Sequence, residues 1–274
     1  MDKSIKQEVL RIKLKFEHGD ADNHHLDFYD ASKSFNGFAK AIAITSHAFL
    51  NKGEIRIKGN SISGGRIFLE KSQSGSFEQF ITIVYENPIY SGLAASALWD
   101  AIKYTWNKVL NNPEDASKTK TMERIEPYFD DLELALETPM FDAHRVIHSD
   151  KKMTIDITSP NRKGNIKLDN ETLKSVEIQK LDKILTGIKG NVTRYSNISH
   201  IGRFFDDILE CTIPFDTKDL SQSEKEILSW SLHESNGAHE LGKVILKVLP
   251  TYSAKSKLKR YTIISVTKAD QESN

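Results

Sequence analysis

The sequence predicts an α+β protein with an N-terminal mixed or antiparallel sheet and amphipathic helices, a helical bridge, and a C-terminal small β-barrel-like domain. Three observations support this prediction. Apolar and polar residues alternate over short runs near both ends of the chain, as in half-buried strands. Between these runs, two long stretches repeat apolar residues at the period of an amphipathic helix. The 274 residues are enough for one large domain or two ordinary ones.

The first predicted strand covers residues 8–17, where apolar side chains alternate with charged ones. Leu26 and Phe28 continue this alternation as a short second strand. The GDADN segment between them (19–23) has the composition of a turn, so we predict an antiparallel hairpin.

A core helix is predicted at about 32–50, with Asp30 as its capping residue. Three further alternating runs at 54–59, 65–71 and 76–86 predict a meander of strands. Together these elements form a ββαβββ unit that a helix at 91–110 completes.

The helix at 91–110 is about as long as a membrane span. Asp100 and Lys103 interrupt it, however, and Trp99 and Trp106 fall on its apolar stripe. This pattern favours packing against a protein core. Binding at a membrane interface is the alternative, but the polar face has few cations.

The composition changes at NNPEDASKTK (111–120), which predicts a boundary. Helices at 120–137 and 139–149 follow, the second beginning at Pro139. Short strands are predicted at 152–158 and 164–168. The predicted domains are 1–112 (ββαβββα), 113–178 (a helical bridge with short strands) and 179–274 (a small barrel).

The C-terminal part alternates in short runs, as in a small barrel or sandwich. The predicted strands are 183–195, 202–205, 208–215, 227–233, 242–250 and 257–267. Ser221 and Glu224 have the spacing of a capping box, yet Leu228, Trp230 and Leu232 alternate with serines. One helical turn leading into a strand satisfies both signals.

Charge and cysteine content bound the function. The 38 basic and 38 acidic residues cancel, so attraction to nucleic acid or to an anionic membrane requires local clustering. A single cysteine, Cys211, excludes an intramolecular disulfide and a multi-cysteine metal site, and predicts a cytoplasmic protein. Its alternation with Ile213 and Phe215 places it in the core. The polar N-terminus lacks the apolar run of a secretory signal.

The stretch EHGDADNHHLD (17–27) has the most metal-like composition in the chain. A calcium loop starting at Asp20 would need glycine at its sixth position and glutamate at its twelfth, where His25 and Ala31 stand. Neighbouring His24 and His25 would point to opposite faces of a strand. We therefore predict a solvated hairpin turn and no metal.

Two other motifs fail for lack of their structural context. GNSISGGR (59–66) lacks the lysine and hydroxyl residue of a phosphate-binding loop and precedes a strand. HESNGAHE (233–240) is interrupted by Asn236 and Gly237, which predict a tight hairpin turn. No catalytic constellation remains.

The remaining candidate is a basic surface that binds single-stranded nucleic acid. Such proteins hold phosphates with cations and stack bases on aromatic rings. The candidate residues are Lys243, Lys247, Lys255, Lys257, Lys259, Arg260, Arg194, Tyr195, Arg203 and Phe204. The alternative is a solvated edge strand whose lysines suppress aggregation.

Two resemblances accompany these residues. Gly190, Val192 and Tyr195 have G-x-V-x-x-Y spacing before an aromatic-rich strand, which resembles the opening of cold-shock and other OB-like barrels without their full aromatic motif. The segments DFYDASKSFNGFAKAIAITSHAF, GSFE (75–78) and KLKRYTIISV are similar to uncharacterised bacterial proteins of unknown function. That resemblance implies no activity and no site residues.

We therefore expect a non-enzymatic binding or adaptor protein without a cofactor or membrane insertion. Its expected partner is nucleic acid or another protein, and an accessory role in bacterial defence is suggested by the resemblance alone. The rival class is an enzyme whose site assembles only in three dimensions, for instance from Asp27, Tyr29 and His47.

Overall fold

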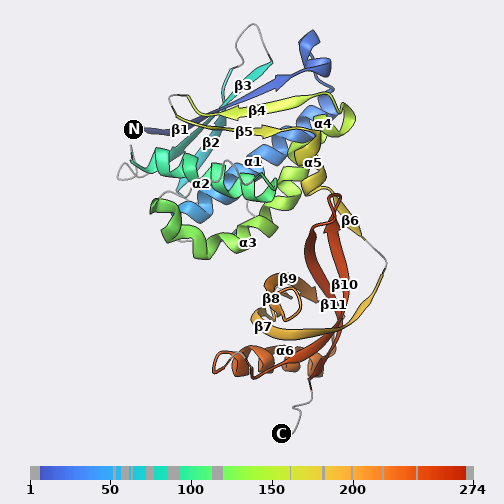
Figure 1. The fold of residues 1–274 in the computed structure, drawn as a ribbon. Coiled ribbons are helices and arrows are strands. Elements are labelled where there is room, and N and C mark those ends of the chain that lie inside the picture. The colour runs from blue at the N-terminus through green and yellow to red at the C-terminus, as the bar shows by residue number, and fades with distance from the viewer. Residues whose placement is uncertain are drawn as a thin grey trace. The chain divides into compact units, whose positions relative to one another are not determined.

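The structure is a computed structural model, and its ribbon is drawn in Figure 1. It describes residues 7–51, 54–56, 62, 64–71, 77–85, 93–112, 120–160, 162–180, 183–198, 200–217, 219–238 and 240–269. The chain forms two compact units, Met1–Glu177 and Ile178–Asn274. The predicted α+β class is confirmed, because the first unit is a five-stranded antiparallel sheet with helices and the second contains a closed five-stranded barrel.

The sheet of the first unit has the strand order β2-β3-β1-β4-β5, with every pair antiparallel. Its strands are β1 (Gln7–Glu17), β2 (Gly65–Leu69), β3 (Glu78–Tyr85), β4 (Thr154–Thr158) and β5 (Asn165–Leu168). The central strand β1 pairs with β3 on one side and with β4 on the other. The segment that the sequence assigned to a bridge thus supplies two strands of this sheet.

Helices cover one face of the sheet, as Figure 1 shows. They are α1 (Phe28–Leu50), α2 (Leu93–Val109), α3 (Lys120–Ala143), α4 (Arg145–Ser149) and α5 (Asn170–Val176). The alternation of β1 buries Leu10, Ile12, Leu14 and Phe16 beneath them.

Helix α2 packs into this core, as its apolar stripe predicts. Trp99 and Trp106 are 1% and 0% exposed. Their indole N–H groups donate to the Lys163 carbonyl (3.1 Å) and to Thr45 Oγ1 (3.1 Å), so both polar atoms of the stripe are satisfied. Among the described helices, none is both long and apolar enough to cross a membrane.

The predicted second strand at Leu26 and Phe28 is wrong. Residues Gly19–Asn23 form a short 3₁₀ helix, and the Asp27 carboxylate then caps α1 by accepting the Asp30 N–H at 2.9 Å. Helix formation leaves Phe28 86% exposed, whereas a strand would have placed it with the core residues. The capping interaction therefore outweighs two residues of alternation.

Two further predictions in this unit need correction. Helix α3 continues through Pro139 to Ala143, so no separate helix starts at the proline. Residues Glu54–Arg56 form no strand, while the rest of the run at 54–59 lies outside the described residues. The predicted strands at 65–71 and 76–86 correspond to β2 and β3.

The barrel of the second unit consists of a three-stranded meander, a helix and a hairpin. Its elements are β7 (Leu185–Ser196), β8 (Ile201–Asp206), β9 (Cys211–Thr217), α6 (Gln222–Ser235), β10 (Val244–Ser253) and β11 (Leu258–Lys268). Strand β10 pairs antiparallel with β7, and β11 pairs parallel with β9, which closes the barrel. The short β6 (Ile178–Lys180) extends beside β10. This connectivity is that of an OB-fold.

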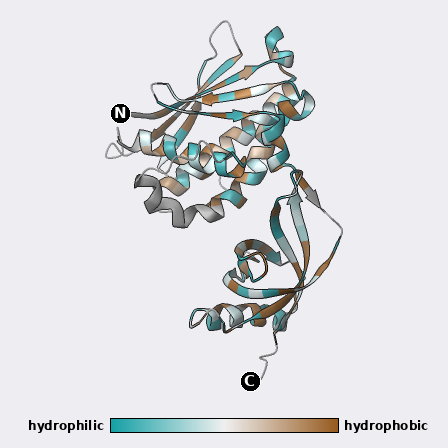
Figure 2. Cartoon of the chain, in the orientation of Figure 1, coloured by the Kyte–Doolittle hydropathy of each residue, from teal (hydrophilic) through white to brown (hydrophobic). Residues whose placement is uncertain are grey.

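Alternating hydropathy along these strands, visible in Figure 2, fills the barrel with apolar side chains. The interior residues are Val192, Phe204, Ile213, Phe215, Leu220, Leu228, Val244, Leu246, Val248, Tyr261, Ile263 and Val266. Because the inward face of each strand packs in this core, only the residues on the outward face are accessible to a ligand.

The segment after β9 differs from its prediction. Ser221 and Glu224 do form a capping box, but it begins a continuous 14-residue helix, α6, instead of one turn and a strand at 227–233. Asn236 ends that helix, so it makes no hairpin turn. Cys211 is also corrected: it is exposed at the first position of β9, where the barrel wall ends, while Ile213 and Phe215 are buried.

Candidate nucleic-acid interface

The outer surface of the barrel is shaped by a bend in β7. Gly190 pairs with Asp206 on β8 and with Val244 on β10, so β7 pairs with a strand on each side at this position. A Cβ atom at this position would lie 1.9 Å from the Phe205 carbonyl oxygen. The missing side chain therefore permits the close approach of β7 and β8.

Beyond the bend, two arginines face each other. A register shift between Val192 and Arg194 places Arg194 directly opposite Arg203 on β8. Arg194 is exposed and Arg203 is half-buried. Like charges directly opposite in an antiparallel pair repel each other, and this pair places two guanidinium groups at one point of the barrel wall.

The aromatic candidates divide between the two faces of the barrel wall. Phe204 is 0% exposed in the core, so its ring is not accessible to a base in this structure. Tyr195 is half-buried and stacks on Phe215, with ring centroids 6.0 Å apart. Phe205 lies two positions beyond Arg203 on β8, on the same side of the strand, and is half-buried.

The six cations of β10 and β11 occupy three separate places. Lys243 stands immediately before β10, where its Nζ lies 2.7 Å from Asp207 Oδ1. Lys247 is exposed in the middle of the strand, opposite Ser265. Lys255 lies beyond the strand's far end, and a ten-residue strand spans about 33 Å. A single continuous strip of these lysines does not form.

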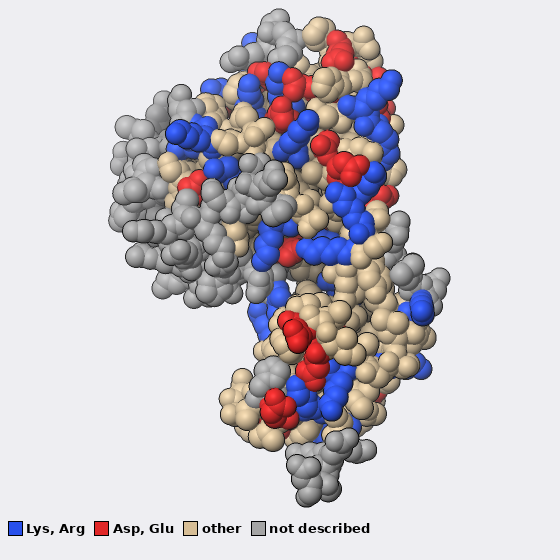
Figure 3. All heavy atoms as spheres, viewed as in Figure 1, with Lys and Arg blue, Asp and Glu red and all other residues tan. Residues whose placement is uncertain are grey.

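The cations around the β10–β11 turn differ in accessibility. Lys255 and Lys257 are exposed, and Arg260 is half-buried. Lys259 is only 7% exposed because it follows the inward alternation of Tyr261. In Figure 3, basic and acidic side chains are intermixed on the face shown, which agrees with the equal numbers of basic and acidic residues in the chain.

A buried carboxylate organises the turn between β8 and β9. Asp206, which is 2% exposed, accepts the N–H groups of Ile208 (2.9 Å) and Leu209 (3.0 Å) on Oδ1. Its Oδ2 accepts the hydroxyl of Tyr261 at 2.9 Å. Burial, together with the Asp206 carboxylate, raises the pKa of Tyr261, so the phenol stays protonated and donating.

The residues suggested for an enzyme site are not brought together. Asp27 caps the start of α1, Tyr29 is 61% exposed in its first turn, and His47 is buried in its last turn. The eighteen positions between Tyr29 and His47 correspond to about 27 Å of helix. Burial, with Arg56 nearby, lowers the pKa of His47 despite the opposing carboxylate of Glu54.

Two other buried polar groups in the first unit serve packing. Asp30 accepts from Arg145 Nε at 2.7 Å and from Ser149 Oγ. Although burial opposes it, these hydrogen bonds hold the pKa of Asp30 below its ordinary value. The second group, His144, is 0% exposed and connects Met140 to Thr172.

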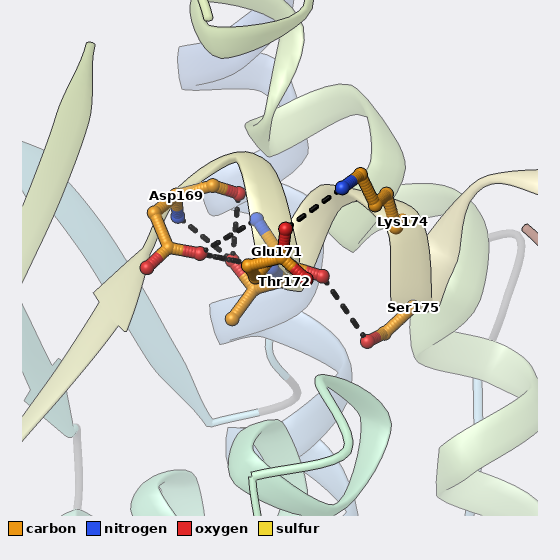
Figure 4. A network of polar contacts seen from close by, with 5 residues as sticks. All are labelled: Asp169, Glu171, Thr172, Lys174 and Ser175. Atoms are coloured by element: carbon orange, nitrogen blue, oxygen red, sulfur yellow. Dashed lines mark hydrogen bonds and ion pairs between the residues drawn. The ribbon is translucent and has the colours of Figure 1, made fainter. Parts of the chain in front are cut away.

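Helix α5, which contains Thr172, starts at a capping box shown in Figure 4. Asp169 Oδ1 accepts the N–H groups of Glu171 and Thr172, each at 2.9 Å, and the Thr172 hydroxyl accepts the Asp169 N–H at 2.7 Å. The Asp169 carboxylate and the Thr172 hydroxyl thus bond to backbone N–H groups at the start of the helix, as in a capping box.

The histidine-rich loop before α1 is a compact turn. His18 N–H donates to Asp22 Oδ1 at 2.9 Å, and His25 Nδ1 donates to the Asn23 carbonyl at 3.1 Å. His18 and His24 have positive φ angles of 66° and 61°. Within the described ranges, no three His, Cys, Asp or Glu side chains are grouped so that they could hold a metal ion.

The fold and this surface define a class: an α+β protein that joins a helix-covered antiparallel sheet to a closed OB-type barrel. Residues 12–177 match the family described as "Domain of unknown function (DUF7946)", and the chain belongs to this family. The match covers the sheet unit and not the barrel. No curated protein and no solved structure matches the chain.

Proposed function

We propose that the protein is a non-enzymatic binding protein whose barrel recognises single-stranded nucleic acid. The observation that carries this proposal is the pair formed by Arg194 and Arg203, which stand opposite each other on the outer face of a barrel with OB connectivity. Barrels of this connectivity bind oligonucleotides on the face of their second and third strands, here β8 and β9; Arg203 lies on β8, and Arg194 lies beside it on β7.

The chemistry of this face suits a single strand better than a duplex. Two cations on neighbouring strands can contact successive phosphates, and Phe205 presents part of its ring beside them. Only a few exposed cations lie on this face and at the β10–β11 turn, so we expect a modest affinity that falls as the salt concentration rises. Lys255 and Lys257 are a second phosphate-contacting group in this proposal.

The test measures fluorescence anisotropy of a labelled oligothymidylate, and of the matching oligouridylate, of about 16 nucleotides. We expect wild-type binding to weaken as salt rises. Arg194→Glu/Arg203→Glu should lower affinity about tenfold or more and should reduce the slope of log K against log salt by about 1.4, the value for two lost contacts.

The matched control is Lys151→Glu/Lys152→Glu, which changes the net charge equally at two exposed positions of the sheet unit. Its affinity should equal that of the wild type. Failure of the wild-type protein to bind either oligonucleotide at low salt, or an equal loss in the control, would overturn the proposal.

A further inference from the structure

The turn between β8 and β9 exposes two large apolar side chains. Ile208 is 77% exposed and Leu209 is 49% exposed. Turns are normally built from Gly, Asn, Asp, Ser and Pro, whose backbone preferences fit the bend. We call the four residues Asp207–Glu210 the tip, and its two central positions hold aliphatic residues that are exposed to solvent.

Hydrogen bonds to residues of the barrel hold the backbone of the tip. Both amides of its aliphatic residues donate to the buried Asp206 carboxylate, and Tyr261 donates to the other oxygen of that carboxylate. The Asp207 N–H also donates to the Lys189 carbonyl at 3.1 Å. Burying a carboxylate is unfavourable unless it is fully hydrogen-bonded, so the barrel core is organised to fix this turn in one conformation.

The tip continues the face proposed for phosphate contact. Phe205 pairs with Thr212, and the hairpin turns two residues later. Arg203 precedes Phe205 by two positions, which is about 7 Å along the strand. A cation that can contact a phosphate and an apolar surface that can contact a base therefore follow one another along β8.

Charge at the tip is largely neutralised. Asp207 Oδ1 lies 2.7 Å from Lys243 Nζ, and both side chains are mostly buried. Glu210, exposed with φ 51°, is the remaining acidic residue of the tip. It opposes an approaching phosphate but leaves the apolar surface of Ile208 and Leu209 accessible.

We propose that Ile208 and Leu209 contact the bases of a single-stranded nucleic acid whose phosphates lie along Arg194 and Arg203. This inference rests on the proposed function. It assigns the contacts with the bases to Ile208 and Leu209, whereas the arginines contact the phosphates. Aliphatic side chains are used by other nucleic-acid-binding proteins as apolar wedges against bases. Asp206 and Tyr261 act here as positioning residues for the tip.

The experiment compares Ile208→Ser/Leu209→Ser with the wild type across a salt series, using the same labelled oligothymidylate. Loss of base contacts should lower affinity about tenfold at every salt concentration and leave the salt slope unchanged. The matched control is Leu241→Ser/Ile264→Ser, which removes two exposed aliphatic side chains elsewhere on the barrel and should bind as the wild type does.

The outcomes separate this inference from the proposed function. If the wild type binds, Arg194→Glu/Arg203→Glu weakens binding, and Ile208→Ser/Leu209→Ser binds normally, the tip does not contact bases and the inference fails alone. A change of salt slope in the tip variant would also overturn it. If the wild type does not bind, the proposed function fails first.

Tyr261→Phe provides a second measurement. It removes one hydrogen bond of Asp206 without changing the shape of the core. We expect faster amide hydrogen exchange at Ile208 and Leu209 and an affinity between those of the wild type and the double-serine variant. Faster exchange with unchanged affinity would contradict a positioning role.

Discussion

The imidazole Nε2 of His144 lies 3.0 Å from the hydroxyl Oγ1 of Thr172, and its Nδ1 lies 2.6 Å from the Met140 carbonyl oxygen. A carbonyl can only accept, so Nδ1 donates and Nε2 accepts from Thr172 in the neutral tautomer. Burial lowers the pKa of His144 to about 4. The neutral ring thus joins α3 to the start of α5.

This histidine predicts a loss of stability in mild acid. Its pKa is lower in the folded protein than in the unfolded chain, so the unfolded chain binds more protons between about pH 6.5 and pH 4. The free energy of unfolding should therefore be full at pH 7 and fall by about 2 kcal/mol at pH 5 from this group. Urea denaturation at both pH values measures the change. His144→Gln should reduce the pH dependence, whereas the exposed His233→Gln should retain it.

Removing the N-terminal cap of α5 should lower the free energy of unfolding by a moderate amount. Asp169→Ala removes a carboxylate oxygen that accepts two backbone N–H groups and should lower the free energy of unfolding by about 1–2 kcal/mol. Lys174→Ala removes an exposed 2.7 Å ion pair to Glu171 nearby and should cost at most a few tenths of a kcal/mol, on the order of other exposed pairs. Equal costs for the two variants would show that the cap adds nothing beyond surface charge.

Trp99 tests the core packing of α2. Trp99→Asp places a carboxylate among residues with no accessible surface and should cost more than about 4 kcal/mol, enough to unfold the sheet unit. Trp99→Phe keeps most of the apolar volume and loses only the N–H bond to Lys163, so the unit should stay folded with a lower midpoint. Circular dichroism during heating distinguishes the two; a folded Trp99→Asp protein would place this ring outside the core.

Gly190 tests the bend of β7. Gly190→Ala puts a Cβ atom against the Phe205 carbonyl and the Phe204 ring, and should destabilise the barrel by about 3 kcal/mol or more. Gly237→Ala, after α6, has the Glu234 carbonyl at 3.4 Å as its nearest neighbour and should change stability by less than about 0.5 kcal/mol. Thermal unfolding of both variants provides the comparison.

Helices and strands were predicted best from the sequence where a long hydrophobic pattern corresponds to a buried face. The alternation of β1 and the stripe of α2 involve many residues that share one buried face, so a few exceptions do not change the result. Short patterns were misleading. Leu228, Trp230 and Leu232 alternate like a strand, yet the capping box at Ser221 and the burial of Leu228 with Ser231 fit a helix.

Pairing of distant segments could not be predicted from local patterns. Strands β4 and β5 complete the sheet of β1, and β9 pairs parallel with β11 across an intervening helix. Nothing in the composition of these strands specifies which partner each one takes, because alternation determines the buried face and not the neighbour.

The candidate site shows the same limit. Sequence analysis placed Arg194 and Arg203 in one group, but only the register shift after Val192 brings them opposite each other. It also grouped Phe204 with them, although alternation directs that ring inward. The hydrogen bonds from Asp206 to the tip are local, but its hydrogen bond with Tyr261 joins residues 55 positions apart in the chain and requires the closed barrel.

The position of β1 at the centre of its sheet has a consequence for folding order. Strand β1 can pair with β3 soon after both have been synthesised. Its pairing with β4, in which Lys13 lies opposite Thr158, can form only after most of the unit has been synthesised. Such distant pairing slows folding and leaves a sheet edge open in the meantime. A nascent chain halted before β4 would therefore be the form most prone to aggregate, and the form on which a chaperone would act.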